Sequence, residues 1–302
     1  MFRVSGIDKM TFTMMMAAVW IYSLGWVVIK IGLNELPPVT FAAFRFIIAT
    51  SLMLLFLGVK RQFSALKVFK KKDWGVLLIM GFVGVFACYV FTFTALTLTT
   101  ASEGGILINM DAVLIAVFSI VFLKEKITSL KVIGFSSAVL GMTLIVTGGQ
   151  FTLGVLTSAR ILGDFLILAS SVCWAAYSMI GKKLADTDRS SPLHVTALGY
   201  AFGAPMLFLY ALFKENIAVV TSVSMVSWIC IAYLGIANSI ATLLWFICLK
   251  KTEDASRVSV FFLLLPICVP ILAFFILNEI ITLFTIVGAL LIILGIYFVE
   301  RH

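Results

Sequence analysis

Charge is scarce in this sequence. Only 12% of the 302 residues are Asp, Glu, Lys or Arg, whereas 62% are hydrophobic and the mean hydropathy is +1.17. A soluble domain of this length leaves too much side-chain surface in water to be built from such a composition. The low charge therefore excludes an ordinary soluble fold and indicates that lipid is the solvent for most side chains.

Residue types that bind metals or activate water are also rare. The chain has two histidines, His194 and the terminal His302, and its five cysteines lie in apolar runs without a CxxC spacing. Metal-assisted catalysis usually needs a cluster of such residues, so we expect no catalytic residue, no metal site and no cofactor. An integral membrane enzyme is a weaker alternative, and His194 is expected to be an exposed polar residue.

Long apolar runs take up most of the chain instead. A helix needs about 20 apolar residues to cross the bilayer core, and the alternating pattern of transmembrane β-strands is absent. We therefore predict an all-α integral membrane protein with ten transmembrane helices. Polar residues divide the chain into runs near 11–31, 39–59, 74–96, 102–123, 130–148, 162–182, 193–213, 227–249, 257–277 and 282–299.

Basic residues are unevenly distributed between the loops. If the N-terminus is cytoplasmic, 18 of the 22 Lys and Arg residues lie inside and three outside, with Arg45 left within a span. Cytoplasmic loops carry such an excess of positive charge. We predict a multi-pass protein of the cell membrane with both termini cytoplasmic. The net charge of +8 then fits anchoring to the lipid surface and not nucleic-acid binding.

The sequence repeats itself at a constant offset of 154 residues. Such matches are informative where they involve Trp, Pro, Glu and Gly, since apolar matches arise easily by chance. The offset predicts two halves, 1–148 and 149–302, each with five spans. Because five is odd, the second half enters the membrane from the opposite side, as in the inverted repeats of secondary transporters. The matched pairs include Trp20 and Trp174, Pro38 and Pro192, Glu125 and Glu279, Gly134 and Gly288, and Gly141 and Gly295.

These landmarks resemble the drug/metabolite transporter superfamily, in particular its EamA-type members with ten helices. The similar segments are CWAAYSMIGKK (173–183), ASRVSVFFLLLPICVPILAFFILNEIIT (255–282), PPVTFAAFRF (37–46) and TASEGGILINMDAVLIAVFSIVFLKEKIT (100–128). The resemblance covers nearly the whole chain and implies transport of metabolites, amino acids or drug-like solutes. The chain departs from the pattern at Ile21, where the family often has Gly, and at Asp111-Ala112, where the second half has Leu265-Pro266.

Asp111 is the most informative single residue. It lies about ten residues into the fourth run, hence about 15 Å along the helix and near the membrane midplane. An ionised carboxylate there costs at least ~2.5–3.5 kcal/mol on insertion scales, so it should face a cavity or a partner. We interpret it as an anchor for a substrate amine or cation, or as a proton-coupling carboxyl; a structural ion pair or hydrogen bond is the alternative.

Several other residues are candidates for the same cavity. Arg45 is suited to a carboxylate or phosphate, although family members commonly have Arg there and a structural role is favoured. Aromatic rings could line a cavity for apolar or cationic solutes, or could serve only to pack helices. Asn side chains could orient a substrate or bond across helices. The aromatic candidates are Trp20, Trp174, Tyr89, Tyr177 and Trp245, and the amide candidates are Asn109 and Asn238.

Charged residues near the ends of the runs are expected to have other roles. We interpret Glu125 and Glu279 as loop-anchoring or helix-capping residues. Lys30 and Glu103 lie at the predicted outer mouth, as steering charges or, more commonly, as solvated flanking residues.

The sequence as a whole favours a secondary transporter, a facilitator or exporter, that moves a small organic solute by alternating access. The nucleotide-binding pattern GxxxxGK[ST] is absent, so we expect no ATP hydrolysis. The expected partners are the small-molecule substrate and membrane lipids, with protons as an optional coupling ion, and a monomer would suffice. A lipid or amphiphile flippase with the same fold is the main alternative.

Overall fold

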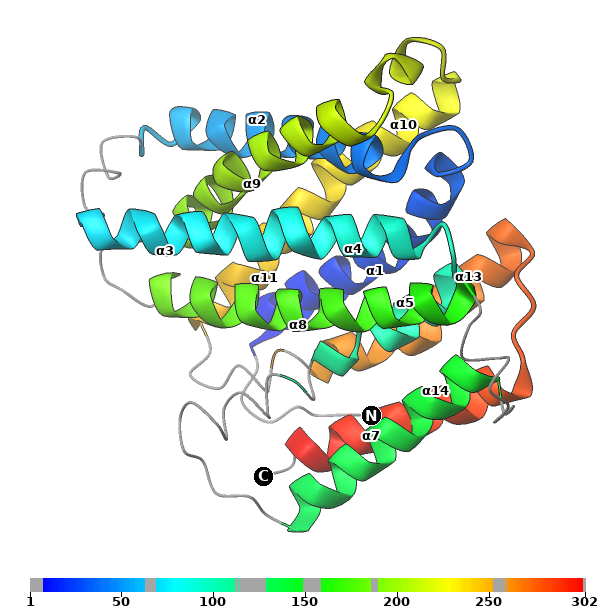
Figure 1. Cartoon of the computed structure of the whole chain (residues 1–302). Coiled ribbons are helices and arrows are strands. Elements are labelled where there is room, and N and C mark those ends of the chain that lie inside the picture. Colours follow the sequence, from blue (N-terminus) through cyan, green and yellow to red (C-terminus); the bar gives the residue numbers. More distant parts are fainter. Residues whose placement is uncertain are drawn as a thin grey trace.

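A computed structural model describes residues 8–62, 69–111, 114, 129–148, 159–185, 190–251, 258 and 260–300. All regular structure within these ranges is helical (Figure 1). In chain order the elements are α1 (Lys9–Gly32), α2 (Pro38–Val59), α3 (Lys71–Gly81), η2 (Phe82–Ala87), α4 (Cys88–Ala95), α5 (Ala101–Leu107), α7 (Ser129–Thr147), α8 (Ala159–Ala185), α9 (Pro192–Lys214), η4 (Ile217–Thr221), α10 (Met225–Tyr233), η5 (Leu234–Asn238), α11 (Ser239–Lys251), η6 (Val260–Leu264), α13 (Leu265–Leu277) and α14 (Leu283–Glu300).

Six helices of the described part are long and apolar enough to cross a membrane. They are α1, α2, α8, α9 and two continuous helices, Lys71–Ala95 and Met225–Lys251. Shorter apolar helices at Val132–Ile145, Leu265–Leu277 and Leu283–Gly295 correspond to the fifth, ninth and tenth predicted spans. Half of the fourth predicted span, 102–123, lies outside the described residues. The structure thus supports a multi-pass helical membrane protein, while the count of ten spans stays a prediction.

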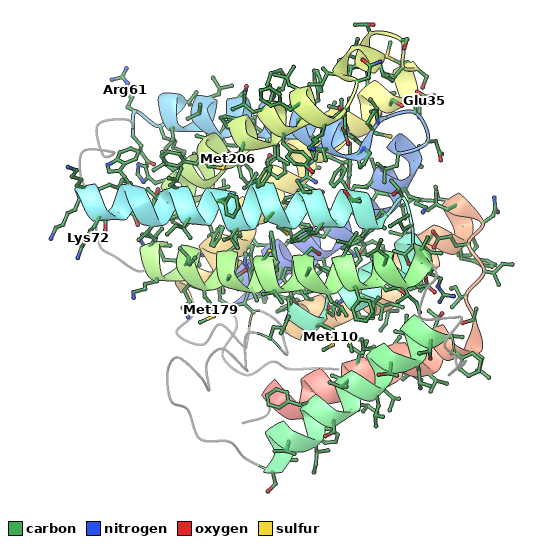
Figure 2. All side chains as sticks on the ribbon, viewed as in Figure 1. Glu35, Arg61, Lys72, Met110, Met179 and Met206 are labelled. Carbon is green, nitrogen blue, oxygen red and sulfur yellow. The ribbon has the colours of Figure 1, made fainter. Side chains whose placement is uncertain are left out.

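Outward-facing side chains of these helices are apolar. Large hydrophobic residues such as Phe213, Phe275 and Leu55 are more than half exposed, which suits a lipid environment because exposed apolar area of this extent is rare on soluble monomers. Several exposed charged side chains lie at the ends of the bundle. Figure 2 shows Arg61 and Lys72 at one end and Glu35 at the opposite end.

The two continuous helices each contain a turn of π-helix. η2 separates α3 from α4, and η5 separates α10 from α11. A Cβ atom added at Gly81, next to η2, would lie 2.9 Å from the Gly199 carbonyl oxygen. One added at Gly235, within η5, would lie 2.9 Å from the Arg45 carbonyl oxygen. Both glycines and both carbonyls are related by the 154-residue offset, so the contact of α3 with α9 is equivalent to the contact of η5 with α2.

The contact between α7 and α14 also joins residues related by the 154-residue offset. Gly141 and Gly288 approach so closely that a Cβ on either would lie 2.5–2.6 Å from the other's carbonyl oxygen. The Ser137 hydroxyl donates to the Leu291 carbonyl at 2.8 Å, and these two residues are themselves 154 apart. Residues related by the offset are thus in direct contact between these two helices. Figure 1 shows this helix pair at one side of the remaining bundle.

Glutamates from loops cap the first turns of helices. Glu279 accepts hydrogen bonds from the backbone N–H groups of Ala101 and Ser102 and from the Ser102 hydroxyl, at 2.6–2.9 Å. Glu215 binds the start of α2 in the same way through Val39 and Thr40. A carboxylate is favourable there because the first N–H groups of a helix lack partners and carry partial positive charge. The capping role predicted for Glu279 is confirmed, while Glu125 lies outside the described residues.

His194 differs from expectation. Its side chain is only 3% exposed, and the imidazole Nδ1 accepts from the Ser191 N–H at 3.1 Å at the start of α9. The Nε2 atom lies 3.2 Å from the Gln62 carbonyl, which therefore accepts from it. The prediction of an exposed residue was wrong because the imidazole serves as a buried cap between two segments.

Candidate substrate cavity

A partly open cavity lies inside the bundle, with a wall built from several helices. Two pairs of its lining residues, Ile108 with Phe262 and Asp111 with Leu265, are counterparts at the 154-residue offset. The lining residues come from both halves of the sequence: Tyr22, Gly25, Trp26, Ile29, Arg45, Cys88, Tyr89, Thr92, Ile108, Asn109, Asp111, Trp174, Asn238, Phe262 and Leu265.

Arg45 on α2 is the cation of this cavity. It is 1% exposed, and its guanidinium carbon lies 4.5 Å, 4.4 Å and 5.7 Å from the ring centroids of Phe46, Tyr89 and Phe93. Such contacts with aromatic faces stabilise a cation, but they do not satisfy its N–H groups. The Nε and Nη1 atoms have no hydrogen-bond partner among the described residues. The buried guanidinium therefore keeps two donor atoms that no described residue uses.

Amide and carboxyl oxygens supply hydrogen-bond acceptors. Asn238 belongs to the π-helical turn η5, is 6% exposed, and its Oδ1 has no hydrogen-bond partner among the described residues. It lies against Gly25, where an added Cβ would come within 2.8 Å of its Nδ2. Asn109 uses its Nδ2 to donate to the Gly105 carbonyl at 2.9 Å. Asp111 is 7% exposed and adds a carboxyl group to the same wall.

Aromatic rings form the apolar part of the wall. Tyr22 packs edge-on against Trp174 and Phe262, with centroid distances of 6.2 Å and 5.8 Å, and donates its hydroxyl to Thr242 at 3.0 Å. Tyr22, Phe262 and Thr92 were not among the predicted site residues. Phe262 could have been found through the repeat, because its counterpart Ile108 adjoins the predicted Asn109.

Six of the nine predicted site residues line the cavity: Asp111, Trp174, Arg45, Asn109, Tyr89 and Asn238. Two others stand behind its wall. The Tyr177 ring lies 5.5 Å from the Trp174 ring and fills the space beside Gly84, and Trp245 lies 4.6 Å from Phe262.

Trp20 lies away from the cavity, with 53% of its surface exposed. The face of α1 that lines the cavity carries Tyr22, Gly25, Trp26 and Ile29, which follow helical spacing. Trp20 precedes Tyr22 by two residues and so projects from the other side of the helix. The counterparts Trp20 and Trp174 therefore have different environments.

Comparison with known proteins places the chain among membrane transporters. The EamA-like transporter family matches residues 9–147 and again residues 161–301. An uncharacterized transporter of Archaeoglobus fulgidus is 32% identical over 279 residues, which cover 92% of each chain. The uncharacterized transporter YyaM of Bacillus subtilis is 29% identical, over 88% of this chain and 86% of its own. A solved crystal structure with 21% identity has a TM-score of 0.68, covering 97% of this chain and 96% of that one, and so shares the fold.

Proposed function

Since the chain belongs to the EamA-like transporter family, we propose that this membrane transporter is a secondary transporter for small zwitterionic organic solutes of the amino-acid type. Its two inverted five-helix repeats, residues 1–148 and 149–302, rock about the cavity and open it alternately to each side. It works as a monomer in the cell membrane, with both termini cytoplasmic and without a cofactor or a catalytic step.

We infer the substrate class from the unsatisfied hydrogen-bond donors of Arg45. Its Nε and Nη1 atoms are buried without hydrogen-bond partners among the described residues, in a cavity whose wall includes several aromatic rings. A buried hydrogen-bond donor without an acceptor costs about 1–3 kcal/mol, and a charged donor costs more. A substrate carboxylate that accepts a charge-assisted hydrogen bond from one of these atoms lowers that cost.

The other end of a zwitterion has acceptors in the same cavity. The Asn238 Oδ1 and the Asp111 carboxylate suit an ammonium group, and the aromatic wall suits an apolar side chain. The repeats differ at the charged positions, because the counterpart of Arg45 is Gly199 and that of Asp111 is Leu265. The similar helix packing of the two repeats supports a rocking motion. The charged residues at these two positions occur in the first repeat only.

Alternating access is supported by the contacts that recur at the 154-residue offset. Gly81 packs on α9 and Gly235 packs on α2, so the two repeats contact each other through equivalent surfaces. Inverted repeats of this kind can exchange conformations and so open one site to either side.

The test compares solutes that differ only at the carboxyl group. Uptake of an aromatic amino acid and of its carboxamide is measured in proteoliposomes for wild type, Arg45→Gln and Arg61→Gln. We expect Arg45→Gln to raise the KM for the amino acid at least ~10-fold, the loss of one charge-assisted interaction, and to leave the carboxamide unaffected. Arg61 is exposed at the end of the bundle, so Arg61→Gln is the matched control.

Thermal unfolding is measured in parallel, since Arg45 also packs against three rings. Equal losses for the amino acid and the carboxamide would reject carboxylate recognition by Arg45. Flux of a fluorescent phospholipid without flux of any water-soluble solute would favour the flippase alternative.

A further inference from the structure

A second buried polar cluster lies at one end of the bundle, where the turn after α4 meets α5 and α8. Its centre is Thr99, whose hydroxyl oxygen lies 2.9 Å from Glu103 Oε2 and 2.6 Å from Asp164 Oδ1. Thr99, Glu103 and Asp164 are 3%, 6% and 0% exposed. None of these acids lines the substrate cavity, so the cluster is a separate site.

The cluster has too few hydrogens if both acids are ionised. A hydroxyl has one proton to donate, and an ionised carboxylate only accepts. The single Thr99 proton can therefore serve one of the two carboxylates, and the other would face an oxygen at hydrogen-bond distance with no hydrogen between them. One added proton supplies the missing hydrogen. The protonated acid donates to the Thr99 oxygen, while the Thr99 hydroxyl donates to the remaining carboxylate.

The surrounding contacts indicate which acid takes the proton. Arg160 Nε and Nη2 both donate to the Glu103 carboxylate, an ion pair that keeps Glu103 charged. Asp164 has no such partner, and its Oδ2 is buried without any hydrogen bond among the described residues. A buried charge without compensation is strongly unfavourable, so Asp164 is the acid that is neutral.

The charges around the cluster support this assignment. Lys30 on α1 donates its ammonium to the carbonyls of Leu96 and Thr99, on the same turn. Glu279 accepts at Ala101 and Ser102, one turn away. Three acids, Glu103, Asp164 and Glu279, thus face two cations, Arg160 and Lys30. The segment 149–158, which precedes α8, contains no Lys or Arg. Protonation of Asp164 balances the group.

The position of the cluster connects it to the substrate cavity. It joins α1, the turn that follows α4, and α8, and the helices α1, α4 and α8 each contribute residues to the cavity wall. The residue after Glu103, Gly104, packs on the cavity residue Trp26, with an added Cβ at 2.8 Å. Opening the cavity toward this end would separate these helices and break the Thr99 contacts.

From this geometry we infer that Asp164, Thr99 and Glu103 form a proton-binding site whose occupancy holds this end of the bundle closed. The proton comes from water at this end and returns to it. Without it, two adjacent carboxylates repel across one hydroxyl and loosen the helices. Because a ligand favours the state that binds it better, proton loading and closure are linked. The coupling role rests on the transport function proposed above, whereas proton binding itself does not.

Infrared difference spectroscopy of the purified full-length protein in lipid nanodiscs tests the proton site without any substrate. The carbonyl band of a protonated carboxyl is followed between about pH 5 and about pH 9, above the range in which solvated Asp titrates. We expect a band in wild type that disappears as the pH rises and is absent in Asp164→Asn. Asp73→Asn, at the start of α3 and the opposite end of the bundle, is the matched control (Figure 1).

Glu103→Gln gives a second readout that does not depend on Asp164→Asn folding. The amide removes the neighbouring negative charge and brings its own N–H donors to Thr99. We expect the band to disappear at least about one pH unit lower, a ~10-fold weaker proton affinity. A wild type without a titrating band, or a band that survives in folded Asp164→Asn, would overturn the site.

Coupling is tested separately in proteoliposomes. If wild-type uptake depends on a pH gradient, Asp164→Asn should lose that dependence and keep exchange of solute. Retained gradient dependence in this variant would overturn the coupling role. Absence of wild-type flux for every solute would reject the proposed function but would leave the infrared result on the proton site standing.

Discussion

Buried polar residues in this protein carry different amounts of information in the sequence. Asp111 and Arg45 could be selected from the sequence as candidates because each interrupts a long apolar run, where a charge is costly. Asp164 was not found because it lies near the start of its run, only four residues after Arg160, where charges are usually solvated. Lys30 and Glu103 were expected to be solvated for the same reason. Glu103 is instead buried and paired with Arg160, and Lys30 is bound to two carbonyls.

Glu35 leads to a pH prediction at the residue scale. It lies in the turn between α1 and α2 and accepts hydrogen bonds from the Ser227 hydroxyl at 2.7 Å and the Ser224 N–H at 2.8 Å. These bonds favour the ionised form and hold the pKa of Glu35 below its ordinary value. The stabilisation is therefore present above the unfolded-state pKa and is lost as the pH falls through the lower folded-state value.

We expect Glu35→Gln to lower the Tm at neutral pH and to have progressively less effect as the pH falls below about 4, where the wild-type carboxylate is itself protonated. The measurement is the difference in Tm between the two proteins in detergent across this range. A difference that does not change with pH would show that the cap does not depend on the charge of Glu35.

Glycine positions determine how the helices approach each other at the element scale. Gly141 on α7 and Gly288 on α14 face each other's backbone, whereas nothing lies within 4 Å of a Cβ added at Gly75 on α3. Backbone atoms cannot move aside as a flexible side chain can. The same substitution should therefore have opposite effects at the two kinds of position.

We expect Gly141→Ala and Gly288→Ala each to destabilise the protein by about 1–3 kcal/mol, the usual cost of overpacking. Gly75→Ala should be neutral or stabilising by up to about 1 kcal/mol, because Ala has the higher helix propensity. Thermal or denaturant unfolding in the same detergent compares the three variants. A Gly141→Ala protein as stable as Gly75→Ala would contradict the close contact of α7 with α14.

Orientation belongs to the scale of the whole molecule. The loop charges predict that Lys72 is cytoplasmic, and Lys72 and Glu35 lie at opposite ends of the bundle (Figure 2). Ser222, close in sequence to the α10 start that Glu35 caps, is exposed. In intact cells, a membrane-impermeant maleimide should label Ser222→Cys above the wild-type level and should label Lys72→Cys only after permeabilisation. The reverse pattern would place the termini outside.

The sequence by itself determined the helical membrane class, the repeat and the family, because these depend on local properties. Backbone groups in lipid must be satisfied within each segment, so a long apolar run already implies a helix. Tertiary structure decided which side of each helix faces the cavity, and it separated Trp174 from its counterpart Trp20. It also left Arg45 without hydrogen-bond partners and brought Asp164 to Thr99, 65 residues away. Such contacts depend on the rotation and packing of whole helices, and residue type alone does not specify them.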